Sequence, residues 1–207
     1  IIPSDDATVS ATALNTVNAA TTIDVSAHNI TNISGTASEL ITVYSAIGEI
    51  DGLGNEAITL TDTSISVSHL NTLDEYTTGS INASAITTII GTTSAINTAY
   101  IAYASDVISG LGNEAITLTE QALDVSSLNI LDSNTTGSIN AAAVITITGT
   151  VSAANTAYSS SGITGLGDET ITLSDTSIDA AYLNTLDGYT SGVINAASII
   201  TLTGSTA

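Results

Sequence analysis

The nonapeptide GLGNEAITL occupies residues 52–60, returns unchanged at residues 110–118 and returns again as GLGDETITL at residues 165–173. A period of 55–58 residues separates other marks too, such as the Leu-Asn pairs that begin at Leu14, Leu70, Leu128 and Leu183. Self-similarity at such a period is typical of repeat architectures, in which copies stack and share a continuous core. The sequence therefore predicts a single solenoid array over residues 1–207.

Each period shows a second level of similarity. INASAITTI, which begins at Ile81, follows the same apolar pattern as ISVSHLNTL, which begins at Ile65. We therefore interpret each period as two coils of about 28 residues, which gives about seven coils in the chain.

Local signals predict an α/β solenoid in which each coil holds short strands and a short helical turn. AITLTD and its copies have the β-branched bias of strands. Residues favoured at helix N-caps stand at equivalent positions of the period, and Thr36 with Glu39 matches a capping box; the N-cap positions are Ser10, Ser66, Asp124 and Asp179. The alternative is an all-β solenoid, in which every segment is a strand and Ser, Asn and Gly mark the corners.

The differences in period length all lie in one segment. Its three copies are SAIGEID at residues 45–51, IAYASDVIS at residues 101–109 and SSSGIT at residues 159–164. A segment that changes length while its neighbours keep their register is expected to be a surface loop.

The composition excludes several functions. The chain has no Lys, Arg or Cys, has 20 Asp and Glu residues, and carries a net charge of −20. Nucleic-acid binding and attraction to anionic membranes both need cationic side chains. The sequence also lacks an apolar run of transmembrane length, so we expect neither nucleic-acid partners nor membrane insertion.

The nonapeptide itself has two interpretations. G-x-G-x-acid resembles the Ca²⁺-binding nonapeptide of secreted RTX repeats, and Ca²⁺ is the one candidate ion. Its candidate ligands are Asp51, Glu56, Asn113, Glu114, Asp168 and Glu169. The other interpretation is structural, with glycines that turn the chain into the following strand. These glycines are Gly52, Gly54, Gly110, Gly112, Gly165 and Gly167.

Acidic and amide side chains also recur at equivalent positions. One acidic set is Asp6, Asp62, Glu120 and Asp175, and another is Glu56, Glu114 and Glu169. We interpret both as a solvated acidic face that keeps molecules apart. Stacked amides are expected to satisfy backbone groups along the coils; two sets are Asn71, Asn129 and Asn184, and Asn82, Asn140 and Asn195.

Catalytic signals are weak. His28 and His69 stand at different positions of the repeat, so neither recurs, and no G-x-S-x-G motif is present. The residues that recur are those that set shape, and we expect a non-enzymatic protein with no catalytic residue.

The strings LNTLD, GLGNEAITL, TTGSINAS and TSAINTAY, in that cyclic order, resemble the tandem repeats of very large surface or secreted proteins of marine cyanobacteria. For proteins of this kind the resemblance implies roles in cell-surface coat, adhesion, motility or defence. Our leading hypothesis is a structural protein of the cell exterior, a surface-layer piece, spacer or filament subunit that binds copies of itself. The alternative function is a Ca²⁺-dependent adhesin that presents its variable loops or its Tyr side chains to glycans.

Overall fold

A computed structural model of the chain describes residues 7–204, in which short parallel strands alternate with seven helices. The α/β prediction is therefore confirmed, and the all-β alternative is wrong. The helices form where a polar N-cap precedes a run of Ala, Leu and Val that can bury one face.

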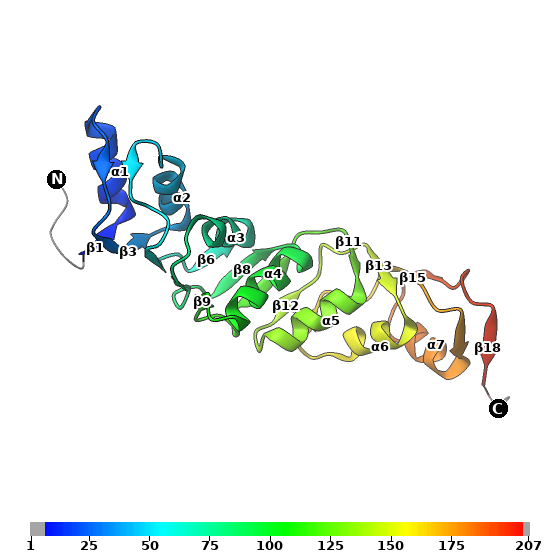
Figure 1. The fold of residues 1–207 in the computed structure, drawn as a ribbon. Coiled ribbons are helices and arrows are strands. Elements are labelled where there is room, and N and C mark those ends of the chain that lie inside the picture. Colours follow the sequence, from blue (N-terminus) through cyan, green and yellow to red (C-terminus); the bar gives the residue numbers. More distant parts are fainter. Residues whose placement is uncertain (1–6, 205–207) are drawn as a thin grey trace. The chain divides into compact units, whose positions relative to one another are not determined.

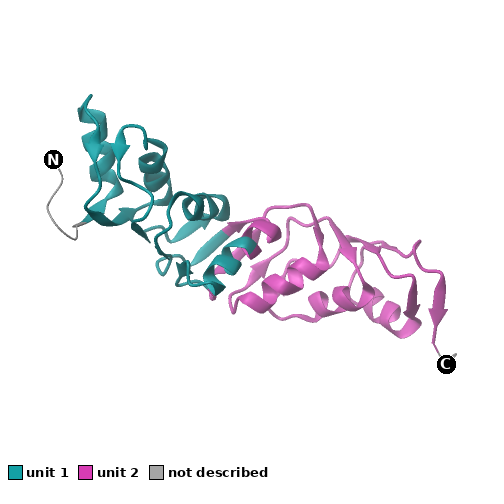
Figure 2. Ribbon diagram, viewed as in Figure 1, with its two compact units in different colours: residues 1–89, 98–111 teal, residues 90–97, 112–207 magenta. Residues whose placement is uncertain are grey.

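The chain divides into two compact units (Figure 2). Unit 1 comprises residues 1–89 and 98–111, and unit 2 comprises residues 90–97 and 112–207. Strand β8 (Thr88–Gly91) and helix α4 (Thr93–Ala104) are divided between the units, and the other elements of Figure 1 belong to one unit each.

Unit 1 contains a five-stranded parallel sheet in the order β1-β3-β5-β7-β9. Its strands are β1 (Ala7–Ser10), β3 (Ile30–Gly35), β5 (Ala57–Leu60), β7 (Ile81–Asn82) and β9 (Ile108–Ser109). Two further strands, β2 (Val25–Ser26) and β4 (Ile50–Asp51), pair with each other, and β6 (Ser64–Ser66) lies next to β8.

The register of this sheet places apolar residues on one another. Val9, Ile33, Ile58, Ile81 and Ile108 are successive Cα partners along the five strands. The four isoleucines are at most 1 % exposed. Because neighbouring strands lie about 4.8 Å apart, such a column buries Ile33, Ile58 and Ile81 each between two apolar neighbours.

Three helices of unit 1 pack side by side, α1 against α2 and α2 against α3 (Figure 1). Their bounds are α1 (Ala11–Ala20), α2 (Ala37–Ser45) and α3 (Val67–Tyr76). The predicted capping box at α2 is present, with Thr36 and Glu39 bonded in both directions. Ser10 also caps its helix, whereas Ser66 precedes α3 without a capping bond because its hydroxyl contacts Ser68 instead.

Unit 2 repeats this arrangement. A four-stranded sheet has the order β11-β13-β15-β17, with β11 (Ala122–Asp124), β13 (Thr146–Gly149), β15 (Thr170–Leu173) and β17 (Ile194–Asn195). Strand β12 (Ile139–Asn140) pairs with β10 (Ala115–Leu118) and β14 (Ile163–Thr164), and β16 (Ser177–Asp179) pairs with β18 (Thr201–Thr203).

The helices of unit 2 are α5 (Val125–Asn134), α6 (Val151–Ser159) and α7 (Ala180–Asp187), and α6 packs against both others. The predicted N-caps Asp124 and Asp179 accept backbone hydrogen bonds from their helices. The leucine of the Leu-Asn pair lies in the first turn of alternate helices. Leu14, Leu70 and Leu128 are buried, and Leu183 is half-buried.

Two sequence interpretations need correction. The segments that begin at Ile65 and Ile81 share a pattern but not a structure, because Ile65 leads into helix α3 whereas Ile81 leads into a turn. In that turn Asn82 Oδ1 accepts the Ser84 N–H. The variable segment at residues 101–109 is also partly helical, since α4 continues to Ala104 before the chain turns at Asp106 (φ 59°).

Candidate functional site

The repeated nonapeptide forms a corner that leads into a buried strand. Gly52 and Gly54 have φ values of 91° and 122°, a region that residues with a Cβ rarely adopt. The corresponding glycines of the other copies, Gly110, Gly112, Gly165 and Gly167, also have positive φ. The structural interpretation of these six glycines is therefore confirmed.

Each corner encloses its own glutamate. Glu56 is 1 % exposed, and its Oε2 accepts hydrogen bonds from the Gly54 N–H at 2.9 Å and the Tyr44 hydroxyl at 3.1 Å. Glu169 is equally buried and accepts from the Gly167 N–H at 2.9 Å and the Tyr158 hydroxyl at 2.6 Å.

The third copy, Glu114, is completely buried and accepts from the Gly112 N–H at 2.9 Å. The interpretation of these glutamates as part of a solvated face is therefore wrong. A buried carboxylate needs donors, and the two-residue return to a glycine N–H supplies one at a short distance.

The tyrosines beside these carboxylates are perturbed as well. Burial and the neighbouring Glu56 raise the pKa of Tyr44, and burial and the hydrogen bond to Glu169 raise the pKa of Tyr158. Both phenols are therefore protonated at neutral pH and can donate these hydrogen bonds. Tyr44 also stacks on Tyr76 with ring centroids 5.6 Å apart, and Tyr158 stacks on Tyr189 at 6.3 Å.

The corner is completed by the segment that follows it by about 24 residues. Thr77 Oγ1 donates to the Glu56 carbonyl at 2.7 Å, and the Thr78 N–H donates to the Gly54 carbonyl at 2.9 Å. Gly79 lies so close to the Glu56 carbonyl that a Cβ there would overlap it. Gly137 and Gly192 stand in the same way against Glu114 and Glu169.

The second acidic set has a different role. Asp62 lies 25 positions after Ala37, the first residue of α2. Its Oδ2 accepts a hydrogen bond from the Ala37 N–H at 2.7 Å. Asp175 does the same for Val151 of α6, and Glu120 accepts the Thr93 N–H and contacts the Thr93 hydroxyl. Carboxylates at helix N-termini are favourable. These three are half-buried and cap helices that lie 24 to 27 positions earlier in the chain, so their assignment to a solvated face is also wrong. Asp6 lies outside the described residues.

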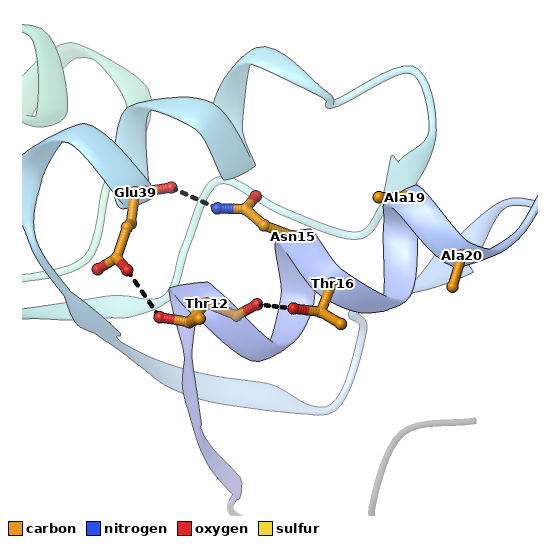
Figure 3. Close-up of a pocket in the computed structure, with 6 residues that line it drawn as sticks. All are labelled: Thr12, Asn15, Thr16, Ala19, Ala20 and Glu39. Atoms are coloured by element: carbon orange, nitrogen blue, oxygen red, sulfur yellow. Dashed lines mark hydrogen bonds between the residues drawn. The ribbon is translucent and has the colours of Figure 1, made fainter.

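The asparagines satisfy backbone groups, as expected, but not by stacking their amides. Asn129 donates to the Ala153 carbonyl of the next helix at 2.9 Å, and Asn15 donates to the Glu39 carbonyl at 3.1 Å (Figure 3). Asn184, the last of that set, is exposed. The other set forms local turns, in which the side-chain oxygens of Asn82, Asn140 and Asn195 each accept the N–H two residues on.

The candidate Ca²⁺ ligands lie in different surroundings. Asp51 is exposed, with Oδ2 at 3.7 Å from His28 Nε2, and Asn113 is also exposed. Asp168 is exposed too, while the three glutamates turn toward their own backbone. Over residues 7–204, no three His, Asp or Glu side chains are grouped closely enough to hold a metal ion. Ca²⁺ binding stays a prediction.

One polar atom of the corner is unusual. Glu56 Oε1 is buried and has no hydrogen-bond partner, although Oε2 has two donors. Such an arrangement costs stability and makes the site sensitive to the charge of the carboxyl group. Sequence reasoning missed the pairing with tyrosine. The sequence signal for this pairing is a Tyr 11 or 12 positions before the corner glutamate, which two of the three copies have.

An open depression lies between α1 and α2 (Figure 3). Its lining residues are Thr12, Asn15, Thr16, Ala19, Ala20 and Glu39. The only carboxylate there is already used, since Glu39 accepts from the Thr12 hydroxyl and from Thr36. These hydrogen bonds, that of the Thr36 backbone above all, lower the pKa of Glu39. The depression therefore offers small side chains and no free charged group.

Comparisons with protein-family models, with curated proteins and with solved structures gave no match. Within residues 7–204, none of the helices has the length and apolar character needed to span a bilayer.

Proposed function

We propose that the chain is a non-enzymatic structural repeat protein of the cell exterior, a surface-layer piece, spacer or filament subunit that associates with copies of itself. One observation carries this proposal. The polar residues that recur with the period bind the chain itself: corner glutamates hold glycine N–H groups, acids such as Asp62 cap helices, and asparagines such as Asn129 hold helix carbonyls. The recurring polar residues therefore stabilise the fold, as expected of a structural protein.

The proposed architecture is an α/β solenoid over residues 1–207. It is supported inside each unit by hydrogen bonds that reach one coil along the chain, with separations such as 24 positions for Thr87 to Thr63 and 25 for Thr164 to Ile139. Small-angle scattering tests it. A globular chain of this length has a radius of gyration of about 17 Å. A solenoid requires a clearly larger value, and a measured value near 17 Å would contradict it.

The location and the self-association are supported by charge. A chain of net charge −20 without a single Lys or Arg repels its copies unless ions screen it. At about 1 M salt the screening length is near 3 Å, so a saline exterior suits association. Antibody labelling of intact source cells tests the location, and sedimentation at low and high salt tests the association. Labelling that requires permeabilised cells would contradict an exterior location.

A second candidate, a Ca²⁺-dependent adhesin, is favoured by one observation. Tyr76 and Tyr189 occupy equivalent positions and are 38 % and 43 % exposed, so each offers a ring surface against which a sugar could pack. Calorimetry with Ca²⁺ and glycans separates the two candidates. Saturable heat that is lost on Tyr76→Ala and Tyr189→Ala supports the adhesin, whereas silence removes it.

A further inference from the structure

The first copy of the repeat departs from the others at three positions that strand pairing and packing make equivalent. Where the other copies have Asn, a small residue, and Ser or Thr, it has Ser26, His28 and Asp51. The residues at these positions elsewhere are Asn82, Asn140 and Asn195; Ser84, Ala142 and Ala197; and Ser109 and Thr164. The three changed side chains lie together, and we call them the His28 cluster.

The backbone holds the His28 cluster in place. Strands β2 and β4 pair in parallel with Ser26 and Asp51 as Cα partners, and the Ala27 N–H donates to the Asp51 carbonyl at 2.7 Å. The His28 ring packs against Gly52, where a Cβ would come within 2.7 Å of Nδ1. The imidazole therefore occupies a place that the corner glycine leaves open.

In the other copies these positions serve the backbone. The asparagine side chains accept backbone N–H groups, whereas Ser26 Oγ lies 3.2 Å from His28 Nδ1. The Ser109 hydroxyl donates to the Ile81 carbonyl, and an ionised Asp51 carboxylate in its place has no proton to donate. The changes in the first copy therefore point to a role other than holding the backbone.

The ring and the carboxylate are spaced as two ligands of one metal ion. His28 Nε2 and Asp51 Oδ2 lie 3.7 Å apart. A tetrahedral ion at about 2.1 Å from each of two ligands holds them about 3.4 Å apart, so a small closure admits it. A metal-bound Nε2 requires the proton on Nδ1, and Ser26 Oγ is placed to accept it. The two ligand side chains are 61 % and 73 % exposed, so water can complete the shell.

We propose that the His28 cluster binds one divalent first-row transition-metal ion such as Zn²⁺, with His28 Nε2 and Asp51 Oδ2 as ligands and Ser26 as a positioning residue. Imidazole suits Zn²⁺, Cu²⁺ and Ni²⁺, whereas Ca²⁺ takes oxygen ligands. The net charge of −20 raises the concentration of cations around the chain. This site goes beyond the proposed structural function and does not depend on self-association.

A Zn²⁺ titration of the full chain, followed by NMR, tests the proposal. The chain has two histidines, and His69 is an internal control because it is exposed and forms no ion pair among residues 7–204. We expect the His28 ring signals to shift and to saturate at one Zn²⁺ per chain, before the His69 signals move. Ca²⁺ at the same concentrations should leave the His28 ring signals unchanged.

Variants assign the ligands. His28→Ala and Asp51→Ser introduce residues that other copies carry at these positions, so both should fold, and circular dichroism checks this. The matched control is His69→Ala. In equilibrium dialysis we expect the control to bind Zn²⁺ like the unchanged chain. Ser26→Ala should weaken binding roughly tenfold, the cost of losing a supporting contact, and each ligand variant should weaken it further. Ser26→Thr keeps the hydroxyl and should restore the affinity.

Two results would overturn the site. Equal midpoints for His28 and His69 would mean that the cluster is only an exposed ion pair. Zn²⁺ binding that tolerates both His28→Ala and Asp51→Ser would place the ion on other carboxylates. Neither result bears on self-association, which sedimentation tests separately.

Discussion

At the scale of single residues, the buried corner carboxylate is the most demanding feature of the molecule. Glu56 Oε2 accepts hydrogen bonds from two donors. One of them is the backbone N–H of Gly54, which has a positive φ. The remaining oxygen has no partner. A group in this position contributes by holding the corner closed, at the cost of a buried charge that water no longer solvates.

Replacement of this side chain should be costly. We expect Glu56→Ala to lower the free energy of unfolding by about 2–4 kcal/mol, because the Gly54 N–H and the Tyr44 hydroxyl lose their acceptor inside the core. Glu56→Gln keeps one acceptor and should cost less. Urea titration measures both, with the exposed Asp24→Ala as control. Equal losses for Glu56→Ala and Asp24→Ala would show that the corner bond is unimportant.

A second residue-scale prediction concerns Asp74. Partial burial, and then the neighbouring Glu75, raise the pKa of its carboxyl group, and one of its oxygens is buried without a partner. A raised carboxyl pKa means that the folded state favours the protonated form, so the charge lowers stability at neutral pH. Asp74→Asn should therefore raise the melting temperature at pH 7.

The gain should vanish as the pH falls below 3.8, the ordinary pKa, because both side chains are then uncharged. The control is Asp106→Asn, an exposed site. Thermal unfolding at several pH values checks the sign. A gain from Asp74→Asn that persists unchanged in acid would mean that its cause is packing and not charge.

Residue-scale reasoning from the sequence found the glycines and missed the glutamates. Gly52 and Gly54 could be predicted because a turn into a strand requires backbone freedom that the letters show directly. The burial of Glu56 could not, since its donors come from Tyr44 on a helix and from the corner itself. Acidic residues are rarely buried unless paired, so the default interpretation was a solvated face.

At the scale of elements, segments about 24 residues apart are joined by backbone contacts that leave no room for side chains. Gly79, Gly137 and Gly192 each pack against the carbonyl of a corner glutamate. The threonines that precede Gly79 donate to the same corner. The Thr77 hydroxyl donates to the Glu56 carbonyl, and the Thr78 N–H donates to the Gly54 carbonyl. These contacts fix the register between each corner and the segment that follows it by 21 to 24 positions.

The close approach of Gly79 to the Glu56 carbonyl can be tested by substitution. Gly79→Ala should destabilise the chain by about 2–4 kcal/mol, because the added Cβ meets backbone that cannot move without breaking the corner. Gly48→Ala is the matched control, since its Cβ would find open space. Denaturant titration compares them. Similar midpoints for the two variants would refute the close approach at Gly79.

The caps between coils are a second prediction at this scale. Asp62→Ala removes the acceptor of the Ala37 N–H at the start of α2, and we expect a loss of about 1 kcal/mol, the usual value of a helix N-cap. Asp62→Asn retains an acceptor oxygen and should lose less. Hydrogen exchange of the α2 amides locates the effect. Faster exchange confined to α3 would assign Asp62 to another role.

Helix starts were predictable because Ser10, Asp124 and Asp179 act on their own helices, within three residues of sequence. The strand pairs were not. Ile58 pairs with Ile81. The similar segments that begin at Ile65 and Ile81 do not pair with each other. Similarity between segments reflects the sequence period. Strand pairing instead depends on which sheet edge the chain reaches after its next helix.

At the scale of the whole molecule, charge of one sign is the dominant property. With a net charge of −20 and no Lys or Arg, the described residues form no ion pair except the exposed His28 with Asp51. Cohesion therefore depends on apolar columns such as Ile33, Ile58 and Ile81 and on hydrogen bonds. Both are opposed by repulsion among carboxylates throughout each unit.

Salt should accordingly stabilise the fold. We expect the melting temperature to rise steadily between about 10 mM and 1 M NaCl, as the screening length falls from about 30 Å to 3 Å. Scanning calorimetry at low protein concentration measures the rise, and an uncharged osmolyte at equal osmolality serves as control. A melting temperature that is independent of NaCl would show that the carboxylates are too far apart to repel.

The corner in which Gly79 rests on Glu56 has a consequence for how such a chain changes in length. The contacts of this corner join residues 21 to 24 positions apart, well within one period, so removal or duplication of a whole period leaves every remaining corner with a partner. A partial period would leave a glutamate without its threonines and glycine. Genes for this chain should therefore grow and shrink by complete periods, and small insertions should survive only in segments such as residues 101–109.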